Sequence, residues 1–309
     1  AQLQGYDPKA LSADAVNEFL AQLVEPVRDV ESVSIFDALG RVLAQDIVSP
    51  MSVPPHDNSA MDGFALAGKL LDAGGTVSLE VVGTALAGKA WEGKAAPGQC
   101  VKIMTGAIMP AGLDTVVPQE FTQLGADGRI TFAADAVKLG DNRRLKGEDL
   151  LEGRPALLDG TRMGPAACGL IASLGIAQVP VRRKLRVAYF STGDEILSLG
   201  EPPREGAVYD SNRYTVHGLL ARLGCEVIDM GVVRDDPAQL EHAFRTAAAK
   251  ADAIITSGGV SVGEADFTKA MMAKLGDVAF WRIAMRPGRP MAVGRSPSTG
   301  SGQAAILFG

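Results

Sequence analysis

Histidine and cysteine, on which most transition-metal sites and many nucleophilic sites depend, are scarce in this sequence. Three histidines and three cysteines occur among the 309 residues. The histidines show no zinc-ligand spacing, which disfavours a histidine-based zinc enzyme and a serine-triad enzyme. Cys100, Cys168 and Cys225 form no C-x-x-C motif, so we interpret them as reduced, buried thiols of a cytoplasmic protein.

Long apolar runs and an excess of positive charge are also missing. No stretch approaches ~18 consecutive apolar residues, so the sequence predicts no membrane span. Residues 1–16 have neither the basic nor the apolar region of a signal peptide. The net charge of −6 disfavours nucleic acid and anionic membranes as partners. The length predicts roughly two domains of ~150 residues.

The pattern of apolar residues changes along the chain. Residues 10–30 predict an amphipathic helix, which Ser12 caps and Pro26 ends. Between about 64 and 137, short apolar runs are punctuated by glycine and proline, which indicates a small β domain inserted between two halves of a first domain. A short helix is predicted over about 164–174.

From residue 182 onward, strands alternate with helices, which predicts a parallel, doubly wound α/β sheet. On the helix over 211–223 we expect Leu219, Leu220 and Leu223 to form the buried face. The other predicted elements are strands over 185–190, 226–230 and 252–256 and helices over 237–249 and 266–275.

Polar loops follow three of these strands. In open parallel sheets, ligands bind beyond the carboxyl ends of the strands, so we expect a site along this edge. The loops are "STGDE" at 191–195, "RDD" at 234–236 and "SGG" at 257–259.

The third loop is the most informative. Gly258 and Gly259 allow backbone N–H groups to approach an anion closely, ahead of a helix N-terminus. Ser257 and Ser261 add hydroxyl donors, and Lys269 adds positive charge. We expect a phosphate cradle here; the alternative is a tight turn between strand and helix.

Asp235 and Asp266 follow successive strands and are expected along the same edge. Carboxylates repel a phosphate unless a cation intervenes, and magnesium binds carboxylate oxygens while it keeps several waters. Helix capping is an alternative that is compatible with metal binding, since Asp235 or Asp236 ahead of Pro237 suits an N-cap.

A local basic cluster stands out in this acidic chain. Arg282, Arg286 and Arg289 lie close together around a Pro-Gly turn. Guanidinium groups suit tetrahedral oxyanions, so we expect an anion site; a solvated surface run is the alternative.

Two polar segments have no chemistry that their spacing alone identifies. One is "DNSAMDG" at 57–63, and the other is "NRRLKGED" at 142–149. For Asp57 we expect an Asx-turn with its own backbone.

Eight motifs in one order resemble those of the MoeA/gephyrin-E family, the molybdopterin molybdenumtransferases. The resemblance runs from about residue 10 to the last residue. The motifs are "DNSAMDG", "IMTGA", "KGED", "STGDE", "YDSNR", "RDDP", "SGGVSVGEADFTK" and "RPGRP".

The resemblance implies an elongated, multidomain homodimer. It implies a MogA/MoaB-like doubly wound α/β domain that binds molybdopterin, a β-rich inserted domain and a mixed linker domain. The implied boundaries are 1–52 with 144–181 for the discontinuous N-terminal dimerisation domain, 53–143 for the insertion and 182–309 for the α/β domain. The family's "LPGNP" motif would begin after Gly309, so we expect the C-terminal β-barrel domain to be missing and this 309-residue form to be weak or inactive.

The resemblance also implies an activity in molybdenum cofactor biosynthesis: magnesium-dependent insertion of molybdate into adenylylated molybdopterin, with release of AMP, in the cytoplasm. The implied partners are a second subunit that shares the site, a MogA-type adenylyltransferase and molybdoenzyme-maturation proteins. Two alternatives are a scaffold of the gephyrin type and a nucleotide pyrophosphatase of the MoaB/CinA-like fold. The absence of a linker disfavours the first, and the inserted domain disfavours the second.

Site residues are carried over by motif. Asp62, Thr105 and Asp149 would come from the partner subunit, and Asp235 and Asp266 would bind the metal. Some relatives carry lysine where Arg282 and Arg286 stand, which leaves the role of these two arginines open. The implied catalytic residues are Asp62, Asp149, Glu195, Asp235, Asp266 and Arg286. The implied cofactor-binding residues are Thr105, Ser191, Thr192, Gly193, Asp210, Ser257, Gly258, Gly259, Ser261, Lys269, Arg282 and Arg289.

Overall fold

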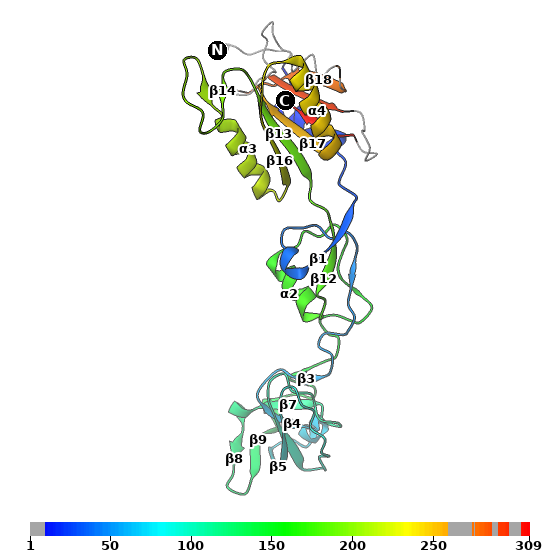
Figure 1. The fold of residues 1–309 in the computed structure, drawn as a ribbon. Helices are drawn as coiled ribbons and strands as arrows, with labels where there is room; N and C mark the ends of the chain where they lie inside the picture. The colour runs from blue at the N-terminus through cyan, green and yellow to red at the C-terminus, as the bar shows by residue number, and fades with distance from the viewer. Residues whose placement is uncertain (1–9, 259–273, 275, 286–289, 297–303) are drawn as a thin grey trace, which may run out of the picture. The chain divides into compact units, whose positions relative to one another are not determined.

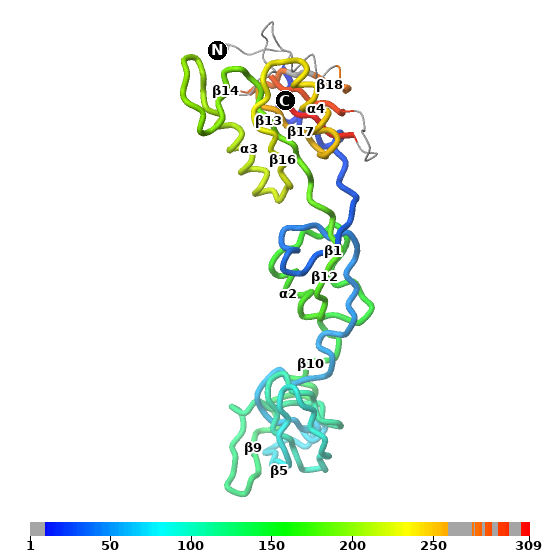
Figure 2. The backbone as a smooth tube through the Cα atoms, in the orientation of Figure 1, coloured from blue at the N-terminus to red at the C-terminus, as the bar shows by residue number. Residues whose placement is uncertain are grey.

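The computed structural model describes residues 10–258, 274, 276–285, 290–296 and 304–309. Two compact units are present, each built from segments that are distant in the sequence. The three-domain division expected from the sequence stays a prediction. The α/β unit comprises Ala1–Val33, Ala38–Val42 and Pro180–Gly309, and the β-rich unit comprises Ser34–Asp37 and Leu43–Val179 (Figures 1 and 2).

The α/β unit contains a six-stranded sheet in the order β16-β13-β17-β20-β19-β18. The first four strands are parallel, as predicted, but β19 runs antiparallel to both β20 and β18. The strands β18 and β19, which form this antiparallel edge, were not among the predicted strands. The connection from β18 to β19 is too short for the crossover of roughly a dozen residues that parallel pairing needs. The strands are β13 (Arg186–Thr192), β16 (Glu226–Val233), β17 (Ala253–Ser257), β18 (Asp277–Arg282), β19 (Pro290–Arg295) and β20 (Ile306–Phe308).

Two helices pack on this sheet, α3 (Ser211–Arg222) and α4 (Pro237–Lys250). Because successive residues of a strand point to opposite faces, Val187 of β13 packs with Leu220 of α3, whereas Ala188 and Phe190 pack with α4. Phe190 meets Phe244 of α4 edge to face, with ring centroids 5.0 Å apart.

The expectation for the buried face of α3 is wrong for two of its three leucines. Leu220 is buried, but Leu219 and Leu223 are 54% and 73% exposed. Of these three leucines, only Leu220 faces the sheet, so the buried face of the helix is narrower than the spacing of its apolar residues predicts.

The first helix begins where the sequence predicts. In α1 (Ala13–Leu23), the Ser12 Oγ accepts a hydrogen bond from the Ala15 N–H at 3.1 Å. The helix ends before Val24, earlier than the predicted range, and only Val16 is buried. The preceding Leu11 N–H donates to the Arg282 carbonyl at 2.9 Å, which joins this segment to β18.

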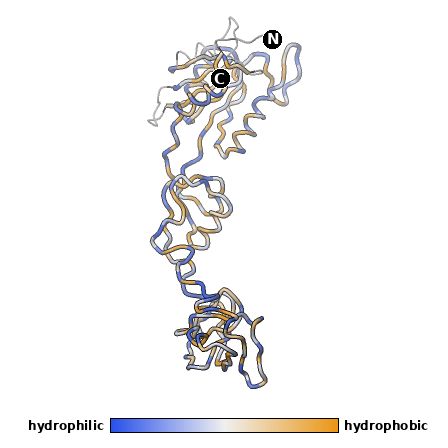
Figure 3. Tube along the Cα trace, turned by 180° about the vertical axis from the view of Figure 1, so that it is seen from behind, coloured by the Kyte–Doolittle hydropathy of each residue, from blue (hydrophilic) through white to orange (hydrophobic). Residues whose placement is uncertain are grey.

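The β-rich unit contains a mixed six-stranded sheet in the order β7-β4-β6-β5-β9-β8. Both faces of the sheet are apolar: Phe64 and Val117 belong to one buried cluster, Ala65 and Val101 to another. Figure 3 shows hydrophobic stretches in the middle of this unit. The strands between Gly63 and Ala133 confirm the β-rich segment that the sequence predicts. The strands are β4 (Gly63–Leu66), β5 (Thr76–Ala85), β6 (Gln99–Ile103), β7 (Thr115–Pro118), β8 (Gln123–Leu124) and β9 (Arg129–Ala133).

Short elements complete the described chain. The helix α2 (Pro165–Ser173) starts with Pro165 in its first turn and confirms the predicted helix. A 3₁₀ turn covers Ile35–Asp37, and further 3₁₀ turns lie at Gly68–Ala73, Gln119–Phe121 and Ala134–Ala136. The remaining strands are β1 (Val30–Ser34), β2 (Ile47–Val48), β3 (Asn58–Ser59), β10 (Arg143–Arg144), β11 (Pro155–Leu157), β12 (Gln178–Arg182), β14 (Ile196–Leu197) and β15 (Val208–Tyr209).

The three cysteines do not share one environment. Cys100 is buried in the β sheet, and burial raises the pKa of its thiol to about 12. Cys168 and Cys225 are only partly buried, so the expectation of buried thiols is wrong for these two. Within the described ranges, no helix is long and apolar enough to span a bilayer.

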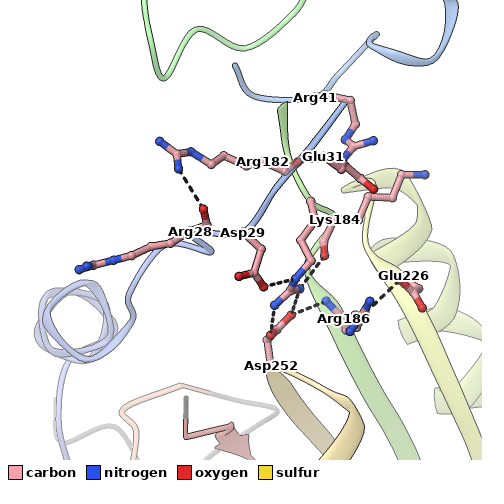
Figure 4. Close-up of polar contacts among 10 residues, drawn as sticks. Arg28, Asp29, Glu31, Arg41, Arg182, Lys184, Arg186, Glu226 and Asp252 are labelled. Atoms are coloured by element: carbon pink, nitrogen blue, oxygen red, sulfur yellow. Dashed lines mark hydrogen bonds and ion pairs between the residues drawn. The ribbon is translucent and has the colours of Figure 1, made fainter. Parts of the chain in front are cut away.

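A polar lock fixes the amino ends of β13 and β17 (Figure 4). Arg183 forms two hydrogen bonds with the Asp252 carboxylate, at 2.7 and 2.8 Å, and a third with Asp29 at 2.6 Å. Asp252 also accepts from the backbone N–H of Arg186 at 2.8 Å. Since Arg186 begins β13 and Asp252 precedes β17, one carboxylate connects the starts of two neighbouring strands.

Two effects act on the pKa of Asp252. Burial by itself raises it, but the hydrogen bonds from Arg183 and from the Arg186 N–H outweigh burial, and the pKa is lowered from 3.8. A carboxylate with a lowered pKa stabilises the fold above its ordinary pKa, and this contribution is lost as the pH falls through the lower value.

We predict that Asp252→Asn weakens this lock at neutral pH, because the amide offers Arg183 one acceptor oxygen and no charge. The free energy of local opening of β13 and β17 should fall by about 2 kcal/mol, as for hydrogen bonds to charged groups. Hydrogen exchange of the backbone amides of these two strands measures the change.

Glu226→Gln is the matched control. Arg186 Nε lies 3.4 Å from Glu226 Oε2, between two side chains that are about half exposed, and such pairs contribute about 0–1 kcal/mol. The difference between Asp252→Asn and the unsubstituted protein should shrink as the pH falls below 3.8. A difference that stays constant would contradict an ionic role for Asp252.

Candidate functional site

The carboxyl ends of β13 and β17 form the centre of the candidate site. The two strands are paired in register, with Ser191 opposite Ser257. This pairing brings together five residues that the sequence analysis selected from two separate loops. They are Ser191, Thr192, Gly193, Ser257 and Gly258.

Two positions at this edge favour glycine, for different reasons. Gly258 has φ +97°, and a Cβ at this position would lie 2.5 Å from the Thr192 carbonyl oxygen. Gly193 has φ +141°, and its Cβ would lie 2.6 Å from Oε2 of Glu195. The Glu195 side chain, which is exposed, therefore folds back over the Gly193 backbone. At Gly258 the Thr192 backbone leaves no room for a side chain, whereas at Gly193 the neighbour is the flexible end of Glu195 and the positive φ is what favours glycine.

Three buried oxygens near this edge have no hydrogen-bond partner among the described residues: Thr192 Oγ1, Thr256 Oγ1 and Asp210 Oδ2. Asp210 is 4% exposed and caps α3, where its Oδ1 accepts from the Arg213 N–H at 3.0 Å. Burying a polar atom without a partner is unfavourable, so such atoms often mark a place where a ligand or water supplies the partner. Asp210 and Thr192 were predicted; Thr256 was not, although it directly precedes the "SGG" loop.

Two further side chains were missed by the sequence analysis. The Tyr189 hydroxyl lies 3.0 Å from Ser191 Oγ, and the Asn212 Nδ2 donates to Ser257 Oγ at 2.8 Å. Burial raises the pKa of Tyr189, although hydrogen bonds with Ser191 and Ser257 act in the opposite direction. Asn212 could have been found, because it belongs to the "YDSNR" motif. Tyr189 gave no signal, because it sits in an apolar strand.

In the "RDDP" loop, one aspartate caps a helix and the other lies beside the "STGDE" loop. Asp236 caps α4, where its Oδ1 accepts from the Gln239 N–H at 2.9 Å. Asp235 is therefore not the cap, and its backbone N–H donates to Asp194 Oδ1 at 3.4 Å. Arg234 Nη1 donates to the Asp194 carbonyl at 3.0 Å. These contacts join the "RDDP" loop to the "STGDE" loop.

The donor set at this edge fits magnesium in kind. No group of three or more histidine, cysteine, aspartate or glutamate side chains suited to a metal occurs among the described residues. Magnesium, however, takes only one or two carboxylates and completes its shell with waters and substrate phosphates. Asp235, which does not cap a helix, is one described carboxylate at this edge, and Asp194 and Glu195 belong to the neighbouring loop.

Several predicted site residues lie outside the described residues, so their roles stay predictions. The described member of the arginine cluster is Arg282, which is exposed at the end of β18. The others outside the described ranges are Gly259, Ser261, Asp266, Lys269, Arg286 and Arg289.

In the β-rich unit, the structure joins Asp62 to Thr105. Asp62 Oδ1 accepts from the Thr105 backbone N–H at 2.7 Å and from its hydroxyl at 2.8 Å. These two bonds lower the pKa of Asp62, with a smaller effect from the charge of Lys102. Asp62 is exposed, as predicted, and its Oδ2 has no hydrogen bond with any described residue. The side chain is thus fixed through one oxygen and available through the other.

The segments "DNSAMDG" and "NRRLKGED" meet through the antiparallel pairing of β3 with β10. Asp57 Oδ1 accepts from the Lys146 N–H at 2.8 Å, so the expected Asx-turn of Asp57 with its own backbone is wrong. Arg144 binds Asp149 at 2.6 Å and also binds Glu148. Asp57 therefore holds the second segment in place, while Asp149 is exposed beside an arginine.

Two protein-family models match this chain. A family model described as the MoeA N-terminal region, domains I and II, matches residues 11–175. A second model, described as a probable molybdopterin binding domain, matches residues 188–309. Together the two models cover nearly the whole chain.

Named relatives agree with the family models. A molybdopterin molybdenumtransferase of Haemophilus influenzae is 46% identical over 281 residues, which is 91% of this chain and 69% of that protein. One of Nostoc sp. is 38% identical over 302 residues, which is 96% of this chain and 69% of that protein.

Two solved structures share the fold. One crystal structure of a molybdopterin biosynthesis MoeA protein from Pyrococcus horikoshii has a TM-score of 0.79 at 32% identity, and a second has 0.80 at 26% identity. In both comparisons, 97% of this chain and 74% of the solved chain are covered. The named relatives also agree with the resemblance inferred from the eight motifs.

We predict that Gly258→Ala disturbs the strand ends, because the new methyl group meets the Thr192 carbonyl at 2.5 Å. The strain should lower the free energy of unfolding of the α/β unit by about 1–3 kcal/mol, measured by urea denaturation.

Gly206→Ala provides the control, since Gly206 has φ +77° and a Cβ there would contact nothing within 4 Å. It carries the left-handed backbone penalty of about 1–2 kcal/mol without the clash. Equal destabilisation by the two substitutions would show that contact with Thr192 does not matter.

Proposed function

Because the chain belongs to the family of molybdopterin molybdenumtransferases, we propose that it transfers molybdenum in molybdenum cofactor biosynthesis, by inserting molybdate into adenylylated molybdopterin with release of AMP. The observation that carries the proposal is the edge formed by β13 and β17. Glycine-dependent backbone and two serine hydroxyls meet there, next to the buried hydroxyls of Thr192 and Thr256, and Asp210 adds a buried carboxylate oxygen at the start of α3. These donors and acceptors suit a ligand that carries phosphate oxygens and N–H groups together.

Magnesium fits this proposal through Asp235, with Asp266 as the second carboxylate expected from the sequence. When bound, the cation would neutralise phosphate charge beside carboxylates that otherwise repel it. The chain's own groups then orient the ligand: Ser191, Ser257 and Thr192 through their hydroxyls, and Gly193 and Gly258 through the close approach of the backbone.

Asp62 is the residue that we propose to act from the β-rich unit. Its lowered pKa keeps the carboxylate ionised, and the two bonds from Thr105 fix its orientation. Its second oxygen is then an acceptor for a substrate donor or a ligand for a cation. We propose that Asp62, Thr105 and Asp149 serve the site of a second copy of the chain.

Exposed apolar side chains in the β-rich unit support assembly of two copies. Phe36 is 93% exposed, and Val48 and Leu158 are also largely exposed. The pairing of β2 with β11 places Val48 opposite Pro155. Exposed aromatic and aliphatic groups of this kind mark protein–protein contacts, and a symmetric dimer would use the same groups twice.

The free thiols agree with a reducing compartment, and we expect the protein to be located in the cytoplasm.

We predict that Asp62→Asn lowers molybdate-dependent release of AMP from adenylylated molybdopterin by at least about 100-fold, the scale seen when one preorganised charged group is removed. The melting temperature should change little, because Asp62 is exposed and the asparagine Oδ1 can still accept from Thr105. Both quantities are compared with those of the unsubstituted protein.

Asp72→Asn is the control, because Asp72 is an exposed carboxylate of the same unit outside the candidate site. Loss of the melting transition in Asp62→Asn would indicate a structural role for Asp62. AMP release that does not depend on molybdate would contradict the proposed reaction.

A second prediction concerns the dimer. Phe36→Ser should raise its dissociation constant by about tenfold or more, because a buried phenylalanine contributes roughly 1.5–3 kcal/mol. Sedimentation velocity over a range of concentrations measures this. Leu124→Ser is the control, since Leu124 is an exposed side chain on β8. An unchanged dissociation constant for Phe36→Ser would place the interface elsewhere.

A further inference from the structure

Tyr189 is a polar side chain in the apolar centre of β13, and it is 1% exposed. Its neighbours along the strand, Ala188 and Phe190, belong to the buried cluster under α4. Tyr189 points to the opposite face, toward α3, as alternation along a strand requires. Its hydroxyl reaches Ser191, two residues further along the same face. The phenol therefore lies beneath the candidate site rather than within it.

A network of four side chains runs across the strand ends from Tyr189. Ser191 lies on β13 and Ser257 opposite it on β17, so their side chains share the face that carries Tyr189. The Tyr189 hydroxyl lies 3.0 Å from Ser191 Oγ, and Ser257 is close enough to lower its pKa as well. Asn212, in the first turn of α3, donates to Ser257 Oγ at 2.8 Å. One buried phenol thus connects two strands and, through Ser257, a helix.

Counting protons shows what this network lacks. Tyr189, Ser191 and Ser257 each carry one hydroxyl proton, while two hydroxyl–hydroxyl bonds use two of the three. The Asn212 amide nitrogen donates its own proton to Ser257, so this bond uses none of the three hydroxyl protons. If Tyr189 donates to one serine, the third hydroxyl proton lies on that serine; if both serines donate to Tyr189, it stays on the phenol. The first arrangement leaves a serine hydroxyl that can donate to a ligand. Because Tyr189 stays protonated, this surplus donor persists at neutral pH.

We infer that Tyr189 is a positioning residue: it holds the Ser191 and Ser257 hydroxyls so that one of them donates to an acceptor oxygen of the ligand. The inference rests on the proposed function, because adenylylated molybdopterin supplies phosphate oxygens as acceptors. Without the phenol, Ser191 loses this partner and must be oriented when the ligand binds, while Ser257 keeps only the bond from Asn212. The ring itself fills the space under α3, so its packing and its hydroxyl have separate roles.

Tyr189→Phe removes the hydroxyl and keeps the ring. We expect the dissociation constant for adenylylated molybdopterin to rise about tenfold, with kcat for molybdate insertion changed much less than KM. Tyr209→Phe is the matched control, because it also removes one hydrogen bond, from the Tyr209 hydroxyl to the Glu201 carbonyl at 2.8 Å, outside this network. Tyr209→Phe should bind the ligand like the unsubstituted protein.

A combined substitution separates positioning from stability. If Tyr189 acts through the two serines, adding Tyr189→Phe to a variant that carries Ser191→Ala and Ser257→Ala should not weaken binding further. A further loss of affinity on that addition would overturn the inference, as would equal binding by Tyr189→Phe and the unsubstituted protein. An unsubstituted protein that binds no adenylylated molybdopterin would overturn the proposed function as well, so the two failures are distinguishable.

Discussion

The in-register pairing of β13 with β17 is the constraint on which the rest of the α/β unit depends. It places Ser191 opposite Ser257, and it brings Gly258 so close to the Thr192 carbonyl that no side chain fits between them. A shift of β17 by one residue against β13 would turn Ser257 to the opposite face and separate it from Ser191, Tyr189 and Asn212. The positions of the hydroxyls, the glycines and the buried oxygens are therefore consequences of one strand pairing.

That same pair of strands is fixed at its other end by charge. Asp252, ahead of β17, accepts hydrogen bonds from Arg183 and from the first residue of β13. The carboxyl ends, by contrast, contain buried oxygens without partners and backbone with positive φ, both of which weaken a fold. Satisfied polar groups at the amino ends thus offset unsatisfied ones at the site. Stabilising contacts at the amino ends therefore allow the sheet to remain folded while its carboxyl ends present strained backbone and polar groups to a ligand.

Elements and motifs were predictable from the sequence where they depend on local pattern. Ser12 and Pro165 marked helix starts, alternating strands and helices gave the parallel core, and the strand-end rule selected Ser191 and Ser257. Long-range contacts were not predictable in this way. Asp57 bonds to Lys146 across 89 residues, where a local turn was expected. In the sequence, Tyr189 resembles the other residues of an apolar strand, and only the folded structure shows that a serine hydroxyl lies beside it. The antiparallel edge and the exposed leucines of α3 were missed because packing, not propensity, decides both.

Negative charge at the described edge opposes the binding of an anion. Asp194, Glu195 and Asp235 all belong to loops at this edge, and the nearby Arg234 is engaged with the Asp194 carbonyl. Hydroxyl and backbone donors are neutral, so they orient a phosphate but do not cancel its repulsion by three carboxylates. Either a divalent cation or the arginines expected from 282–289 must supply the positive charge. The carboxylates favour the cation, since they would otherwise weaken the binding of the substrate that the neutral donors are placed to receive.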